Sequence, residues 1–457
     1  MSVQNTNGAT PAAAAAVTDT AAVTDTAAVT DTGAVTDTEL LERFRPVFDR
    51  IAEGALDRET TRRIPLEEAG WLRDRGFGAL RVPRELGGSG VTLRQLFLLL
   101  IELGAAESNL VQALRVHFRF TEDRWRERDT ERGKLWLRRI GEGAIVGNAS
   151  SERSGNVRGQ TNTTLRKQGD KLLLNGVKYY STGSLYSDYI SVAVVQGDGE
   201  RVTALVPSTA EGVQLLDDYS GFGQRTSASG TSTFTDVEVD PDAVIAFDRV
   251  FAGQVAIVQL VHLATLAGIV RRAVDETAGF VRRRRRSYSQ ASADLPREDP
   301  QVQQVLGRAD AVAHAAAEIV LGVAAALDRA SDARFDLRAA PREQRTPEAE
   351  ARVRALELDA ELNVYRAQTT VIDLVLRTTT EIFEVGGASA LDESLHLDRH
   401  WRNARTLASH NPVIYRERQL GDYLLNGTEP LNQPSVGEAP GLAPAADDPA
   451  PALVVVS

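Results

Sequence analysis

The chain has 457 residues, of which 42% are hydrophobic and 25% charged, and this is enough for two or three packed units of a globular protein. Its formal net charge of −11 argues against nucleic acid as a main partner, because phosphate backbones favour basic protein surfaces. The lack of cysteine excludes disulfides, iron–sulfur clusters and thiolate catalysis.

Both ends of the chain are predicted to be disordered tails. Residues 1–38 contain AAVTDT three times and then GAVTDT, and the spaced aspartates leave too little apolar surface to offset the entropy of ordering. Residues 431–457 are rich in proline and alanine. Neither a secretory leader nor a run of 18 apolar residues is found, so we expect a cytoplasmic protein with no membrane partner.

Residues 39–145 are predicted to form an N-terminal α domain. Apolar residues recur there at helical spacing, for example at Leu41, Phe44 and Phe48. We expect Pro65 to open one helix and Gly76 to close it, and the glycine loop VPRELGGSGVTL to precede the next helix.

Residues 146–250 are predicted to form a compact central β domain. Short β-branched runs alternate there with turn residues, as in DYISVAVV, the GDG turn and RVTALVP. The pair Asn175-Gly176 is typical of a tight hairpin turn.

Residues 251–430 are predicted to form a C-terminal helical bundle. The first of its helices is apolar on most sides, as a buried helix would be, and the last is expected to follow Pro412. Two further long helices are expected from about 301 to 330 and from 347 to 384, with an exposed loop, SDARFDLRAAPREQR, between them.

The order of these units, with the motifs VPRELGGSG, GNASSERSG, GVKYYSTG and FEVGGAS, resembles the acyl-CoA dehydrogenase superfamily over about residues 40–427. The resemblance implies an α+β fold with an N-terminal helical domain, a central β-barrel-like domain and a C-terminal four-helix bundle. It also implies a flavin between the β domain and the bundle, and a homotetramer in which a neighbouring subunit supplies part of the cofactor site.

The chain departs from an acyl-CoA dehydrogenase at the catalytic base. Such an enzyme needs a carboxylate to remove a proton next to the thioester. The usual family position for that glutamate falls at His410-Asn411-Pro412, and the alternative position lies on a helix, 251–274, that has no Asp or Glu. The runs DRHWRNARTLASHNP and KYYSTGSLYSDY resemble instead the superfamily branch of flavin-dependent monooxygenases, which use reduced FMN and O2.

This branch implies a two-component enzyme that receives reduced FMN, in preference to FAD, from a separate NAD(P)H-dependent flavin reductase. Its chemistry passes through a C4a-hydroperoxyflavin that oxygenates a small apolar molecule at sulfur, nitrogen or aromatic carbon. Three alternatives stay open: an FAD-dependent acyl-CoA dehydrogenase with a displaced base, an N-hydroxylase of an amine or amino sugar, and a flavin-free scaffold. No dinucleotide-binding fingerprint follows a strand, so the reductase must be a second protein.

The main catalytic candidate is His410, which matches an active-site histidine of the branch. Asn411 and Pro412 suit an N-cap and a first helical position, so the positive end of the last helix would keep His410 neutral. A neutral ring could accept a proton or hydrogen-bond the peroxide.

Three further catalytic candidates are implied by the resemblance. Ser181 and Thr182 match a strand along the flavin edge, where only one hydroxyl can face the flavin, and Thr182 is the first choice. The alternative is an ordinary strand with edge hydroxyls. His117 lies where it could reach the substrate side, or it is a core histidine beside Phe118 and Phe120.

The resemblance also assigns residues to cofactor binding. Asn148 could donate to and accept from flavin ring atoms, and the glycines of the GGAS motif would let backbone N–H groups approach a phosphate. The run RRRRR could bind the flavin phosphate or form a solvated face. The cofactor-binding candidates are Asn148, Ser150, Tyr179, Tyr180, Thr182, Arg284, Arg286, Gly386, Gly387 and Ser389.

No metal site is predicted. His396 and His400 share a helical face with Asp398 between them, but HLDRH lacks a third ligand. His262 and His314 lie in apolar helical segments and are interpreted as core residues.

Overall fold

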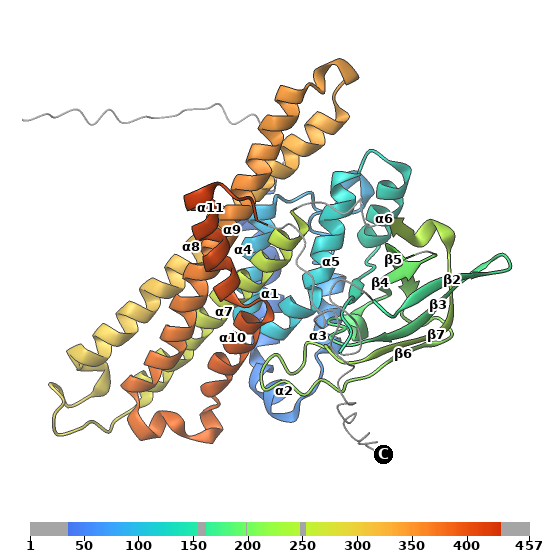
Figure 1. The fold of residues 1–457 in the computed structure, drawn as a ribbon. Helices are drawn as coiled ribbons and strands as arrows, with labels where there is room; N and C mark the ends of the chain where they lie inside the picture. Colours follow the sequence, from blue (N-terminus) through green and yellow to red (C-terminus); the bar gives the residue numbers. More distant parts are fainter. Residues whose placement is uncertain (1–34, 154–160, 198, 247–252, 431–457) are drawn as a thin grey trace, which may run out of the picture. The chain divides into compact units, whose positions relative to one another are not determined.

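The computed structural model describes residues 35–153, 161–197, 199–246 and 253–430, and among these a helical part flanks a β sheet (Figure 1). The predicted tail 431–457 and residues 1–34 of the other predicted tail lie outside the described residues. The predicted α+β architecture, with helices on both sides of a central sheet in chain order, is confirmed.

The N-terminal part is helical, as predicted. Thr36 caps the first helix and Thr92 the fourth, each in a capping box in which a side chain three residues later bonds back to the cap. The first helix begins inside the predicted 1–38 tail, since Thr36 and Glu39 satisfy its free N–H groups. The helices are α1 (Asp37–Glu53), α2 (Ala55–Thr61), α3 (Leu66–Asp74), α4 (Leu93–Ala106), α5 (Ser108–Arg126) and α6 (Glu131–Gly141).

The central part is one mixed sheet of eight strands within the described residues, in the order β6-β7-β3-β2-β4-β5-β8, with β1 pairing parallel to β4. Its inner face buries Leu174, Val192 and Phe234 in a separate hydrophobic core. The strands are β1 (Val146–Ala149), β2 (Thr164–Gln168), β3 (Lys171–Lys178), β4 (Tyr189–Gln196), β5 (Glu200–Pro207), β6 (Val213–Leu215), β7 (Ser232–Val239) and β8 (Val244–Ala246).

The hairpin predicted at Asn175-Gly176 is wrong. Both residues lie inside β3, at an irregularity in its pairing with β7, and the chain reverses between β2 and β3 at Gly169 instead. Gly176 has φ +150°, and a Cβ there would lie 2.6 Å from Thr163 Oγ1. The glycine therefore permits a bulge in β3 and the close approach of Thr163, as glycines inside strands often do.

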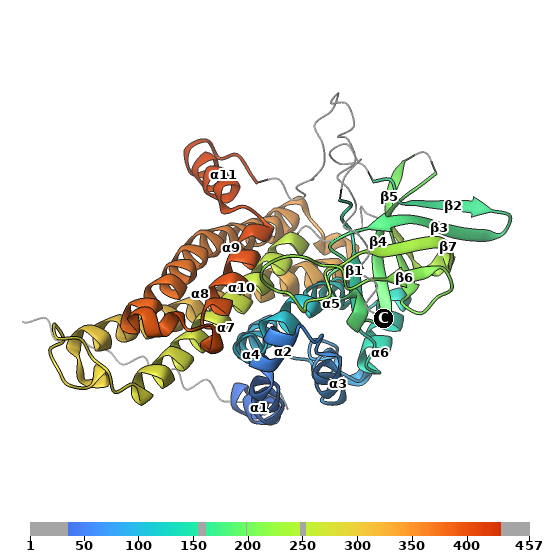
Figure 2. The same cartoon turned by 90° about the horizontal axis from the view of Figure 1, so that it is seen from below.

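The C-terminal part consists of α7 (Gln254–Arg283), α8 (Pro300–Ala339), α9 (Pro347–Glu381), α10 (Asp398–His410) and α11 (Val413–Asn426). Helix α7 packs against α4 and α5 as well as α8 and α9, so the two helical parts share one core (Figure 2). The loop predicted at 331–345 is wrong for its first nine residues, which extend α8. Arg334 in this extension forms ion pairs with Glu350 and Glu357 of α9, and these pairs hold the charged segment against α9 as a helix.

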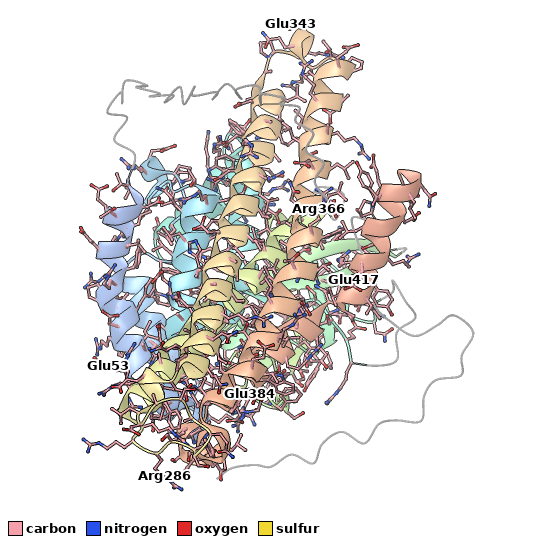
Figure 3. The ribbon with its side chains drawn as sticks, turned by 90° about the vertical axis from the view of Figure 1, so that its left-hand side faces the viewer. Glu53, Arg286, Glu343, Arg366, Glu384 and Glu417 are labelled. Carbon is pink, nitrogen blue, oxygen red and sulfur yellow. The ribbon has the colours of Figure 1, made fainter. Side chains whose placement is uncertain are left out.

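Helices α8 and α9 form an antiparallel hairpin whose turn carries Glu343 (Figure 3). Both α7 and α8 are long and apolar enough to cross a membrane, but a core helix passes the same test. The apolar window of α7 is 78% buried, whereas that of α8 is only 39% buried. Helix α8 is therefore less buried than α7 along its apolar window.

Candidate active site

The loop between β6 and β7 ties the sheet to the helices at one place. Gln224 N donates to Asn403 Oδ1 of α10 at 2.5 Å, and Gln224 Nε2 donates to Ser108 Oγ of α5 at 2.9 Å. Thr226 N donates to Asn109 Oδ1 at 3.1 Å. Strand, loop and two helices therefore converge where several of the candidate residues lie.

His410 is the last residue of α10, and its ring packs against that of His262 of α7, with 4.5 Å between the ring centroids. His410 is exposed as a residue, yet desolvation by the surrounding protein, followed by the charge of Arg115, lowers the pKa of its ring to about 3. His410 is therefore neutral at physiological pH.

The predicted N-cap role of Asn411 is wrong. Asn411 follows the C-terminus of α10, and Pro412 is the N-cap of α11. The Asn411 side chain donates to Gln259 Oε1 at 2.8 Å, and its carbonyl accepts from Gln368. Because His410 ends a helix, it lies at a negative dipole end, and its neutrality comes from burial and from Arg115.

His262 and Arg115 were not identified as site residues from the sequence. His262 is fully buried, and neither of its ring nitrogens has a hydrogen-bond partner among the described residues. Burial, then His410 and Arg115, lower its pKa well below 6.5. The side chain of Arg115 is also buried, and its Nε lacks a partner. The available signal was an arginine that interrupts the apolar run LVQALRVHF of α5.

Ser181 and Thr182 do not belong to a strand, because β3 ends at Lys178 and Tyr180 has φ +60°. The alternation argument therefore does not apply to them. Thr182 Oγ1 is hydrogen-bonded to Ser229 Oγ at 2.9 Å, whereas the buried Ser181 Oγ has no partner in the described part of the chain. The geometry thus favours Ser181 over Thr182 as the hydroxyl available to a ligand.

Asn148 and Ser150 lie next to this turn. Asn148 N donates to Thr182 O at 3.3 Å, and Ser150 Oγ donates to Asn148 Oδ1 at 2.7 Å. The half-buried Asn148 amide keeps its Nδ2 group without a described partner. Tyr179 is buried and Tyr180 exposed, with 4.6 Å between their ring centroids. The structure therefore brings all the β-domain candidates together.

His117 is fully buried in α5. Its Nδ1 accepts from Val146 N at 3.2 Å, so its Nε2 carries the proton and donates to Gly78 O at 2.8 Å. Burial lowers its pKa to about 4. Since both nitrogens are occupied by the backbone, the geometry favours the core-histidine alternative.

The remaining cofactor candidates meet at the other end of the bundle. Arg284 Nη1 donates to Gly386 O at 2.7 Å, and a Cβ on Gly387, which has φ +50°, would lie 2.1 Å from the Tyr288 hydroxyl. Arg284 and Arg286 also line a cavity of about 360 Å³, together with Tyr288, Glu384 and Val385. Figure 3 shows Arg286 and Glu384 at the end of the hairpin opposite Glu343. Ser389 is half-buried nearby in sequence.

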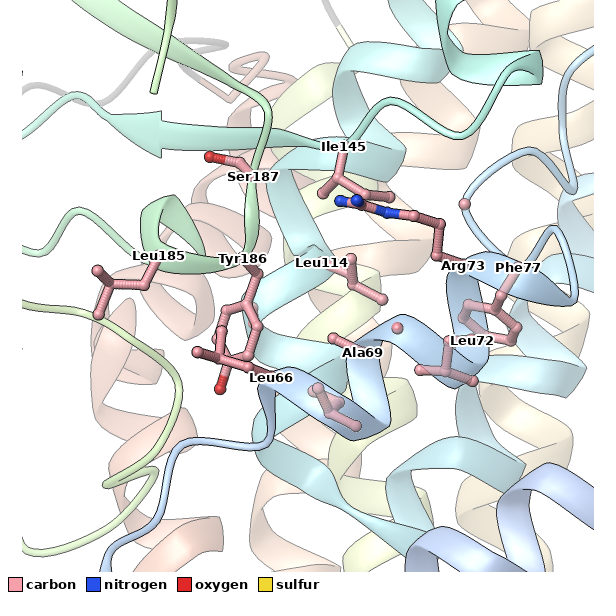
Figure 4. A pocket seen from close by; sticks show the side chains of 14 residues that line it. Leu66, Ala69, Leu72, Arg73, Phe77, Leu114, Ile145, Leu185, Tyr186 and Ser187 are labelled. Atoms are coloured by element: carbon pink, nitrogen blue, oxygen red, sulfur yellow. The ribbon is translucent and has the colours of Figure 1, made fainter. Parts of the chain in front are cut away.

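A second cavity, of about 260 Å³, lies on another face of α5 (Figure 4). Leu66, Leu114, Ile145 and Tyr186 line it, and none of the candidate residues does. We place the chemistry near His410, His262, Arg115 and Ser181 instead, because the last three of these have buried polar atoms without a partner in the described part of the chain.

The described residues contain no group of three or more His, Asp or Glu side chains arranged to hold a metal. His400 Nε2 lies 2.9 Å from Glu276 Oε2, in a network with Arg399. His314, interpreted from the sequence as core, is exposed on α8, so that interpretation is wrong.

Residues 260–414 match the family model for the acyl-CoA dehydrogenase C-terminal domain. Dibenzothiophene monooxygenase from Mycolicibacterium goodii is 30% identical over 390 residues, which are 80% of this chain and 88% of that protein. The chain belongs to the flavin-dependent monooxygenase branch of the acyl-CoA dehydrogenase superfamily.

Two further comparisons agree with this assignment. A protein described as a probable FMNH2-dependent monooxygenase, SfnC from Pseudomonas putida, is 26% identical over 84% of this chain and 94% of its own length. The crystal structure of FMN-bound TdsC from Paenibacillus sp. A11-2 has a TM-score of 0.75 and 26% identity, and covers 86% of this chain and 99% of TdsC.

Proposed function

We propose that this chain is the oxygenase of a two-component system, which takes reduced FMN from a separate NAD(P)H-dependent reductase and inserts one atom of O2 into a small, largely apolar molecule. The observation that carries the proposal is the environment of His410. Its ring is neutral, lies against His262, and no carboxylate contributes to its pKa. A dehydrogenase would need a base at this place.

The residues present fit a flavin. The buried Ser181 hydroxyl without a partner and the free Nδ2 of Asn148 lie on adjacent segments, and both suit the polar edge of an isoalloxazine. At the far end of the bundle, Arg286 is exposed and could bind a phosphate. When bound, reduced FMN supplies two electrons, so one oxygen atom enters the substrate and the other leaves as water.

In this proposal the chain's own residues position the reactants and exclude water. Ser181 and Asn148 would orient the cofactor by hydrogen bonds. His410 would keep one proton on a single ring nitrogen and present its unprotonated nitrogen as a hydrogen-bond acceptor during oxygen transfer. The apolar α7 would form a dry wall behind His410, because its side chains between Val255 and Val270 are aliphatic or uncharged.

Each alternative has a distinguishing result. An FAD-dependent acyl-CoA dehydrogenase would bleach bound FAD on addition of an acyl thioester, and the lack of a base speaks against it. An N-hydroxylase of an amine would require a carboxylate for the ammonium group, whereas the charged neighbour of His410 is Arg115. A flavin-free scaffold would not bind FMN in a fluorescence titration.

The decisive experiment mixes the full chain with a flavin reductase, NADH, FMN and O2, and screens sulfides, indoles and amines by mass spectrometry. The expected result is a product heavier by one oxygen atom. His410→Ala should release hydrogen peroxide in place of product. A wild-type rate without excess peroxide in this variant would refute the role of His410.

We also propose a homotetramer in the cytoplasm. The partial exposure of α8 supports assembly, since only 39% of its apolar window is buried. Light scattering coupled to size-exclusion chromatography should give four times the 49.5 kDa mass of the chain. A monomer would contradict the proposed assembly.

A further inference from the structure

Arg115 differs from the other deeply buried arginines of the helical part in having no anion or carbonyl to bind. Arg58 donates to Glu107, Glu68 and the carbonyl of Ile51 at 2.6 to 3.0 Å. Arg81 donates to Glu122 and to a carbonyl. Arg115 is just as buried, at 5% exposed, but makes no hydrogen bond or ion pair to any described residue.

The ionisable neighbours of Arg115 are an arginine and two neutral histidines, so none of them compensates its charge. On α5 its charged neighbour is Arg119, which lies 3.6 Å from Asp123. On α7 and α10 the neighbours are His262 and His410, whose pKa values Arg115 lowers. No carboxylate acts on any of these three groups. A buried guanidinium without a counter-charge is costly to the fold, and such a cost persists where function requires it.

Gln112 extends the same pattern by one helical turn. Residues 112 and 115 lie on one face of α5 because they are three positions apart. The amide oxygen of Gln112 is buried and also lacks a partner within the described residues. Arg115, Gln112 and His262 thus present donors and acceptors that no described residue satisfies.

We infer that Arg115 is a specificity-determining residue that binds an acid group of the substrate, such as a carboxylate, sulfinate or sulfonate, beside His410 and His262. This inference rests on the proposed function, and it narrows the substrate to a small molecule with an anionic end and an apolar, oxidisable end. The guanidinium fork matches the two oxygens of such a group. The neutral ring of His262 can donate one further hydrogen bond.

The anion could instead be the phosphate of the cofactor, since the same fork binds phosphate. The substrate is favoured because Arg115 is near enough to His410 and His262 for its charge to lower their pKa values, while the candidates for the phosphate, including Arg286 and Gly387, meet at the other end of the bundle.

The first test compares benzoate with its neutral analogue benzamide on the full chain with and without FMN, by thermal shift and calorimetry. Benzoate should bind and raise the unfolding temperature, and benzamide should not. Arg115→Met should weaken benzoate roughly tenfold to hundredfold, as expected for loss of hydrogen bonds to a charged group. The control Arg119→Met removes an equal charge one turn away and should change the affinity by less than about threefold.

Two outcomes of this test would overturn the inference: equal binding of benzoate and benzamide, or equal weakening by both substitutions. Ligand-free Arg115→Met should also unfold at a higher temperature than the wild type, because an unpaired buried charge has been removed. A lower unfolding temperature would mean that Arg115 has an internal partner, and it too would overturn the inference.

A second test separates the two sources of the anion by titrating FMN and riboflavin into the wild type and Arg115→Met. Equal effects on the two flavins support the substrate as the source. A selective loss of FMN affinity would assign Arg115 to the cofactor phosphate and overturn the inference. Benzoate binding is measured without turnover. A failure of the proposed oxygenase activity would therefore appear only in the product assay, and a failure of this inference only in the binding assay.

Discussion

Glu152 and Lys178 form a buried ion pair that fastens the segment after β1 to β3. Their side chains are 6% and 0% exposed, with 2.8 Å between Lys178 Nζ and Glu152 Oε1. Lys178 Nζ also lies 3.4 Å from Ser150 O, and Tyr179 N donates to Ser151 O. Burial alone would raise the pKa of Glu152, but hydrogen bonds, first among them that from Lys178, lower it to about 2.

We predict that Glu152→Gln lowers the free energy of local opening of this segment by about 3 kcal/mol at pH 7. Lowering the pKa from 4.5 to about 2 corresponds to ~3.4 kcal/mol. Removing one partner of a buried pair costs a similar amount, about 3–5 kcal/mol. This stabilisation is present above pH 4.5 and is lost as the pH falls toward 2. Hydrogen exchange at the amides of Thr163 and Tyr179 should therefore accelerate by roughly two orders of magnitude.

The matched control is Glu238→Gln, which breaks the exposed pair with Lys171 on the same sheet. Those side chains are 60% and 62% exposed, with 2.6 Å between the charged atoms. An exposed pair contributes less than about 1 kcal/mol, so exchange near Glu238 should change little. Equal exchange rates in the two variants, measured by mass spectrometry, would refute the reasoning.

Two further predictions concern the site and its pH dependence. Ser181→Ala should weaken FMN binding by roughly fivefold, the value of one hydrogen bond, while Thr182→Val should lower the unfolding temperature and leave FMN affinity nearly unchanged in a fluorescence titration. The reverse order of FMN affinities would count against the Ser181 assignment. Between pH 6.5 and 4 the unfolding free energy should fall, because His117 and His400, each with a pKa of about 4, take up protons only on unfolding. Scanning calorimetry that shows equal unfolding temperatures at pH 7 and 5 would contradict this.

The overall fold follows from patterns that are local in the sequence. Helical periodicity near Leu41 and the capping residue Thr92 specify α1 and α4 without reference to the rest of the chain. The errors arose where long-range contacts decide the structure. Asn175-Gly176 has the composition of a turn, but its pairing with β7 and the approach of Thr163 make it a bulge.

The site could be predicted only in part, for the same reason. His410 and Ser181 were found through motifs that resemble a family. Arg115 and His262 enter the proposed site because they lack partners among the described residues, and this becomes visible only when α5, α7 and α10 are packed together. Conversely, His117 had the right residue type for catalysis, but two backbone groups occupy its ring.

His410→Glu tests whether position 410 and Arg115 act on one another. The substitution places a carboxylate where acyl-CoA dehydrogenases resembling this chain carry their base. Here, however, Arg115 would become its counter-ion, so the pKa of the new carboxyl should be low, and a well-paired carboxylate is a weak base.

The variant should therefore fail to bleach FAD with an acyl thioester, unfold at a higher temperature than the wild type, and no longer bind benzoate, because its own side chain satisfies Arg115. His410→Gln is the control, since it has similar size and no charge and should retain benzoate binding. If His410→Glu bound benzoate as well as His410→Gln, the two positions would be too far apart to share an anion. A single substitution thus links the missing base, the unpaired arginine and the substrate's charge, since all three depend on which anion lies beside Arg115.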